Sequence, residues 1–188
     1  HMYPYNSPWE SRLKNAIADF EKKYRNVDYS PEDIILTPGC ASAFQVIHYT
    51  ILDKGDEIVT FEPVHYLTGP TSYWYCFGAK VVPCRSIESE DWNPDIDELR
   101  SKINEKTQAI SVVSPNNPTG GVYKESALKE IIDVAGENNL AIISDEIYGL
   151  ITFDGIKARS MAEIAEDVPI VVINGMSKIF MRVVWRLG

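Results

Sequence analysis

Lys178 stands where a lysine side chain can take part in chemistry. It follows the apolar run Ile170–Ile173 after the break Asn174-Gly175, and Arg186 comes eight residues after it. The run predicts a buried strand, and residues just beyond such a strand face the crevice in which open α/β sheets bind ligands. A lone lysine is more often a solvated surface residue, so the interpretation depends on what else the chain brings to that crevice.

Other polar residues follow apolar runs in the same way. Asp145 comes after residues 140–143, where a carboxylate is costly unless a cation or a donor meets it. It is either a helix N-cap or the partner of a protonated ring nitrogen in a cofactor, and Tyr148 offers a hydroxyl three residues later. Asn117 in a turn cluster and His65 after residues 57–61 are by default a turn residue and a loop residue, although His65 is also suited to stack on a ring.

A glycine turn adds a candidate anion site. Residues 37–41 turn directly into an expected helix, so the backbone N–H groups around Gly39, Cys40 and Ala41 lie at the positive end of its dipole. Such a helix start binds phosphate well, although any strand-to-helix turn tolerates a glycine. The sequence contains no P-loop, dinucleotide fingerprint or Ser/His/Asp arrangement.

Alternating strands and helices are expected to position these residues. The strands are predicted at 34–36, 57–61, 79–83, 109–113, 140–143 and 170–173. The helices are predicted at 9–24, 41–52, 63–73, 95–103, 124–138 and 161–164, with a polar loop at 86–94. Strands that are almost entirely apolar indicate an α/β fold with a mostly parallel sheet and helices on both faces. The carboxyl ends of those strands share one edge, where the polar residues above can converge.

Composition limits the class of partner. The chain has 188 residues, 45% of them hydrophobic, and a net charge of −9, which disfavours nucleic acid and anionic membranes as partners. We find no signal-peptide pattern and no apolar run near the roughly 20 residues of a membrane span. The three cysteines Cys40, Cys76 and Cys84 lack metal-ligand spacing and predict a reduced, cytoplasmic location without a bound metal. His1-Met2 resembles a cloning remnant.

Three ordered motifs resemble those of class I/II aminotransferases, the pyridoxal 5′-phosphate (PLP) enzymes of the aspartate aminotransferase fold. The motifs are SPNNPTG at 114–120, SDEIY at 144–148, and SK at 177–178 with WRLG at 185–188. The resemblance covers nearly the whole chain. It implies a PLP-binding large domain at 31–188, preceded by an N-terminal segment and amphipathic helix at 1–30. It also implies that the last strand of that domain and the C-terminal small domain lie outside these residues, so that this chain alone is inactive.

The resemblance also implies roles for the cofactor-contacting residues. Lys178 matches the lysine that forms the Schiff base with PLP and then moves the proton, and Asp145 matches the aspartate that keeps the pyridine nitrogen protonated. Asn117 and Tyr148 match the pair that binds the 3′ oxygen of the ring. His65 takes the place of the aromatic ring that stacks on the pyridine.

The remaining implied roles concern the phosphate and the partner subunit. Arg186 matches the arginine that grips the phosphate, beside the backbone of Gly39, Cys40 and Ala41, and Ser177 matches a position that can add a hydrogen bond. Tyr5 (or Tyr3) is near the position whose tyrosine reaches the neighbouring subunit, which implies a homodimer. One departure is Val183-Val184, where the family often has a small-residue pair.

The expected reaction transfers an amino group between an amino acid and a 2-oxo acid. An alternative is a PLP-dependent carbon–sulfur lyase similar to cystathionine β-lyase, because residues 5–9 resemble that branch. Another is a truncated module that binds PLP without turnover. Neither the amino donor nor the acceptor can be chosen from these residues.

Overall fold

The computed structural model describes residues 8–65 and 78–188, and the chain divides into two compact units, His1–Leu36 and Thr37–Gly188. In the first unit, helix α1 (Pro8–Arg25) confirms the amphipathic helix expected at 9–24. The short 3-10 helix η1 (Pro31–Asp33) begins at a capping box, in which Ser30 N–H donates to Asp33 Oδ2 at 3.0 Å.

The strand expected at 34–36 is wrong. These three residues are irregular, and Ile35 is 76% exposed. A strand needs a neighbouring strand to satisfy the hydrogen bonds of its backbone. The nearby residue with a paired backbone is Thr37, which follows the run: its N–H and C=O bond to Gly188 at 2.8 and 3.1 Å. The apolar run is therefore too short and too early in the chain to be the strand that its composition suggests.

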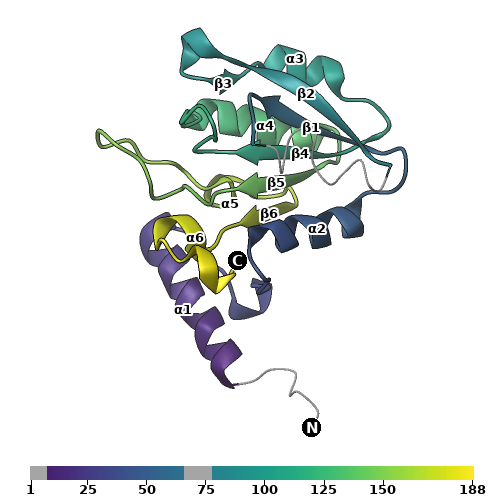
Figure 1. The fold of residues 1–188 in the computed structure, drawn as a ribbon. Coiled ribbons are helices and arrows are strands. Elements are labelled where there is room, and N and C mark those ends of the chain that lie inside the picture. The colour runs from purple at the N-terminus through teal and green to yellow at the C-terminus, as the bar shows by residue number, and fades with distance from the viewer. Residues whose placement is uncertain (1–7, 66–77) are drawn as a thin grey trace. The chain divides into compact units, whose positions relative to one another are not determined.

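The second unit contains a six-stranded sheet in the order β3-β2-β1-β4-β5-β6 (Figure 1). Its strands are β1 (Glu57–Glu62), β2 (Lys80–Ile87), β3 (Asn93–Pro94), β4 (Thr107–Val113), β5 (Ala141–Asp145) and β6 (Ile170–Ile173). All neighbouring strands are parallel except β2 and β3, which confirms the mostly parallel sheet. Strand order changes direction between β1 and β4, so the crevice beyond their carboxyl ends is the place where such folds bind ligands.

The second strand is longer than expected. Instead of stopping at Pro83, β2 continues to Ile87 and pairs back with Asn93–Pro94, inside the segment expected to be a polar loop. The pairing of β2 with β3 begins only at Ser86, so Pro83 needs no donor toward that side and does not end the strand. The reversal uses the 3-10 helix η3 (Glu88–Glu90) and two residues with positive φ, Asp91 and Trp92.

The helices of the second unit are α2 (Cys40–Ile51), α3 (Ile96–Lys102), α4 (Glu125–Glu137), α5 (Met161–Ile164) and α6 (Met176–Ile179), with the 3-10 helix η4 at Val183–Trp185. Four of them lie within two residues of the predicted bounds, whereas α6 and η4 were not predicted. The helix expected at 63–73 falls largely outside the described residues, and its first three residues are irregular.

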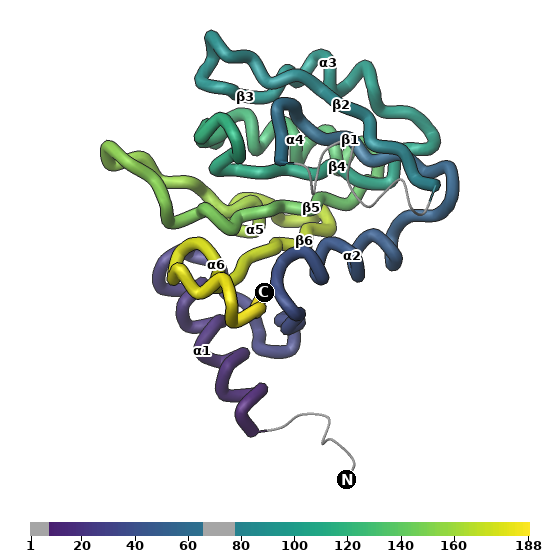
Figure 2. Tube along the Cα trace, viewed as in Figure 1, coloured from purple at the N-terminus to yellow at the C-terminus, as the bar shows by residue number. Residues whose placement is uncertain are grey.

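Two apolar layers cover the two faces of the sheet. Val59, Ile110 and Ile142 pack with α3, α4 and α5, and the residues next to them in the strands, such as Ile58 and Ile143, pack with α2. This alternation follows from the opposite directions of successive side chains in a strand, and it confirms helices on both faces. Figure 2 traces the same strands as a continuous tube.

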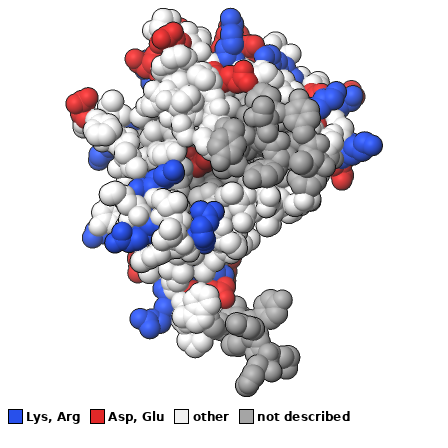
Figure 3. Space-filling view, viewed as in Figure 1, with Lys and Arg blue, Asp and Glu red and all other residues white. Residues whose placement is uncertain are grey.

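The surface carries both signs of charge. On the face drawn in Figure 3, Lys and Arg side chains are interspersed with Asp and Glu around a broad uncharged area. Among the described residues, no helix is both long enough and apolar enough to cross a membrane.

Candidate functional site

Asp145 ends strand β5 at the carboxyl edge of the sheet. Its Oδ1 accepts a hydrogen bond from the Ile147 N–H at 3.1 Å. The pKa of the Asp145 carboxyl is raised to about 7, chiefly by burial and also by the neighbouring Glu146, while the Ile147 amide and the Lys178 ammonium act in the opposite direction. The site therefore holds a carboxyl group whose charged form lacks sufficient compensation from the protein, so a cationic ligand would be favourable there.

Glu146, which the sequence analysis did not single out, fixes the chain just after Asp145. Its side chain is buried, at 2% exposure. Oε1 accepts hydrogen bonds from Ser144 Oγ at 2.8 Å, from Ser160 Oγ at 3.1 Å and from the Met161 N–H at 3.0 Å. These bonds join the end of β5 to the start of α5. The sequence did contain a signal for this role of Glu146. Successive side chains of an extended chain point to opposite sides, so Ser144 and Glu146 are expected on the same side and Asp145 on the other.

Tyr148, Asn117 and Lys178 meet beside Asp145. The Asn117 Nδ2 donates to the Tyr148 hydroxyl at 3.3 Å, and Lys178 Nζ lies 5.8 Å from the centroid of the Tyr148 ring. Asn117 is held by its neighbour Asn116, which is buried and accepts from the Thr119 N–H and hydroxyl at 3.2 and 3.0 Å. Hydrogen bonds within the turn cluster after β4 thus support the side chain of Asn117, a role that the composition of the cluster did not indicate.

Lys178 lies in α6, the short helix after β6. Its ammonium lowers the pKa of Asp145, and it also lowers the pKa of His65, for which burial is the larger cause. Because these effects act over short distances in a partly buried site, they place His65, Asp145 and Lys178 around one space. His65 follows β1, Asp145 ends β5 and Lys178 follows β6, as expected for residues gathered at one edge of a parallel sheet.

Arg186 and the start of α2 form the second part of the site. Gly39 has φ +84°, and a Cβ on it would lie 2.4 Å from the Arg186 Nη2 atom, so only glycine allows the guanidinium to lie this close. The same Nη2 donates to the Pro38 carbonyl at 3.4 Å. The pKa of the Cys40 thiol is raised to about 11, chiefly by burial and also by the Asp145 carboxylate, while Arg186 and Lys178 act in the opposite direction.

The electrostatic contacts of Cys40 connect the two parts of the site. The Cys40 thiol, at the first residue of α2, interacts electrostatically with Asp145, Lys178 and Arg186. The structure therefore brings those three residues to the same region. Ala41 lies in the first turn of α2 and Ser177 directly precedes Lys178 in α6. Tyr3 and Tyr5 lie outside the described residues.

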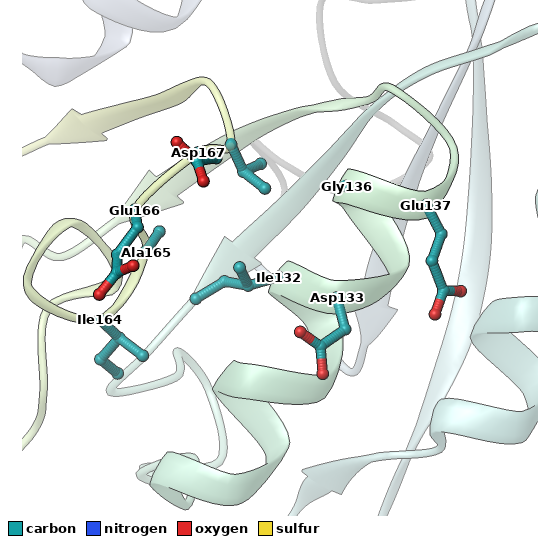
Figure 4. Close-up of a pocket in the computed structure, with 9 residues that line it drawn as sticks. Ile132, Asp133, Gly136, Glu137, Ile164, Ala165, Glu166 and Asp167 are labelled. Carbon is teal, nitrogen blue, oxygen red and sulfur yellow. The ribbon is translucent and has the colours of Figure 1, made fainter.

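A surface hollow of about 430 Å³ lies elsewhere (Figure 4). It is lined by the last turns of α4, which precede the start of β5, and by residues 164–168, which precede the start of β6. It is therefore at the amino edge of the sheet, opposite the candidate site. Its acidic residues are Asp133, Glu137, Glu166 and Asp167, yet no group of three or more His, Cys, Asp or Glu in the described part of the chain is arranged to hold a metal.

Comparison with known proteins gives a consistent result. Residues 6–188 match the family described as Aminotransferase class I and II. The chain is 34% identical over 187 residues to an aspartate aminotransferase of Bacillus subtilis (strain 168), covering 95% of this chain and 45% of that protein. It is 33% identical over 175 residues to a glutamate-pyruvate aminotransferase of Haemophilus influenzae, covering 93% of this chain and 43% of that protein.

Solved structures give the same answer for the fold. The structure of an alanine aminotransferase from Pyrococcus furiosus superposes with a TM-score of 0.89 at 42% identity, covering 95% of this chain and 44% of that one. The chain thus spans less than half the length of the curated relatives it matches.

Proposed function

This chain belongs to the class I and II aminotransferase family, and from that premise we propose that it is the PLP-binding part of an enzyme that transfers an amino group between an amino acid and a 2-oxo acid. The observation that carries the proposal is the convergence of Lys178, Asp145 and the Asn117–Tyr148 pair at the carboxyl edge of the sheet. The relatives reported above are all named aminotransferases, so we do not propose the carbon–sulfur lyase.

The charges and donors of the site suit PLP. The Arg186 guanidinium, the glycine at position 39 and the first turn of α2 would hold the phosphate, since a cation and a helix start both favour an anion. Asp145 would face the ring nitrogen. When bound, PLP would supply an aldehyde carbon for attachment to an amine and a ring that withdraws electrons.

Asp145 would keep a proton on that ring nitrogen. Its own pKa of about 7 reflects a charge that burial penalises, and a cation at hydrogen-bond distance would remove most of the penalty. The Asp145 carboxylate, whose charge the protein does not fully compensate, would thus be free to pair with a cationic group of the ligand. Stabilisation of developing charge by such a fixed group is commonly the largest single contribution to catalysis.

Lys178 would attach the cofactor through Nζ and, when released, take and return the proton of the substrate Cα. Tyr148 is within reach of its ammonium, and Tyr148 and Asn117 would hold the 3′ oxygen of the ring. His65 would cover one face of the ring, and Ser177 would add a hydrogen bond to the phosphate. Residues 31–188 then form the cofactor-binding large domain.

We further propose a cytoplasmic homodimer. Cys40 and Cys84 are free thiols in the structure, in keeping with a reducing compartment. Tyr5 would reach the phosphate held by the partner subunit. Measurement of the mass in solution tests the dimer, and a titration of PLP binding to Tyr5→Phe tests the reach of that residue.

Covalent labelling tests the proposed function. The protein is incubated with PLP, reduced with borohydride and digested, and the modified peptide is identified by mass spectrometry. We expect the label on Lys178, loss of the label in Lys178→Arg, and an unchanged result in the control Lys129→Arg, whose ammonium forms a surface ion pair with Glu125 at 2.7 Å. Labels spread over surface lysines with Lys178 unmodified would overturn the assignment.

Activity is assayed with pairs of amino acids and 2-oxo acids. New amino acid formed by the wild type and lost in Lys178→Arg supports the transferase. Labelling of Lys178 without turnover would instead support a module that binds PLP and does not use it.

A further inference from the structure

We propose that Gly175 and Gly188 are positioning residues that hold the phosphate-binding arginine and the cofactor lysine in a fixed relation to the start of α2. Three chain segments cross at these glycines: residues 37–40, residues 174–176 and residues 187–188. We call this contact the glycine crossing. The inference rests on the proposed function, because it concerns how the proposed phosphate grip is built.

Gly188 leaves no room for a side chain. A Cβ there would lie 2.6 Å from the backbone nitrogen of Cys40 and 2.7 Å from the carbonyl carbon of Gly39. Both atoms belong to the backbone that begins α2, so a methyl group can be accommodated only if one of the two segments moves. Such a movement displaces either the helix start or the residue next to Arg186.

Gly175 is restricted in the same way from the other side. A Cβ there would lie 2.8 Å from the Leu187 carbonyl oxygen, 3.0 Å from Cys40 Sγ and 3.2 Å from Gly188 Cα. Its backbone is extended, with φ at 176°, so any residue could adopt its conformation. The need for glycine is therefore the close approach of the three segments and not an unusual backbone angle.

Hydrogen bonds fasten the glycine crossing. Thr37 exchanges two bonds with Gly188, the Met176 N–H donates to the Leu187 carbonyl at 3.1 Å, and the Cys40 thiol donates to the Asn174 carbonyl at 3.2 Å. The two residues after Arg186 are thereby tied both to the segment before α2 and to the first residue of α6. That short helix carries Lys178.

The glycine crossing therefore fixes Arg186, which would bind the phosphate, relative to Lys178, which would attach the cofactor. Arg186 has a left-handed backbone conformation, with φ 49° and ψ 51°, and its guanidinium already lies against Gly39 and Pro38. With the following residues locked, the grip on a phosphate and the attachment point at Lys178 stay in register on one ligand. Preorganised groups bind more tightly because they lose less freedom on binding.

Alanine substitutions test the positioning role. Gly188→Ala and Gly175→Ala are compared with Gly136→Ala in α4, where a Cβ meets only Val168 Cγ2 at 3.4 Å. Binding of PLP and of pyridoxal, which lacks the phosphate, is measured by titration of the ligand absorbance. Thermal unfolding without ligand reports whether each variant folds, and Gly175→Ala carries the test if Gly188→Ala does not fold.

We expect the dissociation constant for PLP to rise by at least about tenfold in both variants, the effect of losing one hydrogen bond to a charged group. The constant for pyridoxal should change much less, and Gly136→Ala should match the wild type for both ligands. An equal loss for both ligands would mean a general structural role and overturn the inference, as would an unchanged preference for PLP. A wild type without any preference for PLP over pyridoxal would refute the proposed phosphate site itself, a result distinct from either of these.

Discussion

Asp145→Asn should stabilise the cofactor-free protein at neutral pH while it weakens cofactor binding. The substitution keeps the shape of the side chain and removes its charge. In the folded protein the pKa of the carboxyl is raised from 3.8 to about 7, chiefly by burial. The unfolded chain therefore loses this proton at a lower pH than the folded chain does.

The sign follows from proton linkage. Between pH 3.8 and pH 7 the folded state binds more protons at this group than the unfolded state, so the free energy of unfolding falls as the pH rises through that window and is level above it. Each pH unit is worth about 1.4 kcal/mol, which gives about 4 kcal/mol for a rise from 3.8 to about 7. Asp145 keeps partial contact with solvent, which lessens the penalty, so we expect about 2 to 4 kcal/mol.

Urea unfolding of the cofactor-free protein at pH 4.0 and pH 8.0 measures the effect. The difference in stability between Asp145→Asn and the wild type should be near zero at the lower pH and reach the full value at the higher one. Because other titrating groups are common to both proteins, their contributions cancel. Asp133→Asn on the exposed surface of α4 is the control variant. A difference that is the same at both pH values would refute the reasoning. With PLP present the order should reverse, because the variant lacks the partner of the ring nitrogen.

Substitutions at three further positions test the supports of the site. Glu146→Ala should lower the free energy of unfolding by about 3 to 5 kcal/mol, because it leaves three buried donors without an acceptor. Glu146→Gln keeps an acceptor oxygen and should lower it by less than half as much. Equal values for the two variants in urea unfolding would contradict this. Tyr148→Phe should leave stability within about 1 kcal/mol and weaken PLP binding by about threefold to tenfold, since it removes the hydroxyl that meets Asn117; unchanged binding in a titration would exclude that role. Arg186→Lys should weaken PLP binding by about tenfold, because an ammonium cannot form the two-pronged contact of a guanidinium, and equal affinity for PLP would show that the fork is not used.

Much of the fold could be predicted because its strands are short apolar runs bounded by turn residues. Five of the six predicted strands were found, and parallel pairing placed their carboxyl ends on one edge. His65, Asn117, Asp145 and Lys178 follow or end four of these strands. Their convergence needed only the rule that parallel strands share an edge, so the pattern of the sequence was sufficient for this half of the site.

What could not be predicted depends on contacts between distant segments. The strand expected at 34–36 had the right composition and no partner, and the extension of β2 to Ile87 depends on its pairing with β3. The role of Glu146 depends on Ser160, which lies fourteen residues away. No local rule distinguishes Gly175 and Gly188 from ordinary turn glycines. The atoms that exclude a side chain at Gly188 belong to Gly39 and Cys40, and those at Gly175 belong to Cys40, Leu187 and Gly188.

The supports described above would couple the proposed cofactor to the fold. Three of the groups that would contact PLP are held by neighbours with no proposed part in the chemistry. Glu146 holds the segment after Asp145, Asn116 holds the turn of Asn117, and the glycine crossing holds Arg186. At neutral pH the charge of the largely buried Asp145 lowers the stability of the cofactor-free protein. A cation bound beside Asp145 would remove this destabilisation, and the free energy gained would contribute to binding. The same burial that lowers the stability of the cofactor-free chain would therefore favour a ligand with a positive charge beside Asp145.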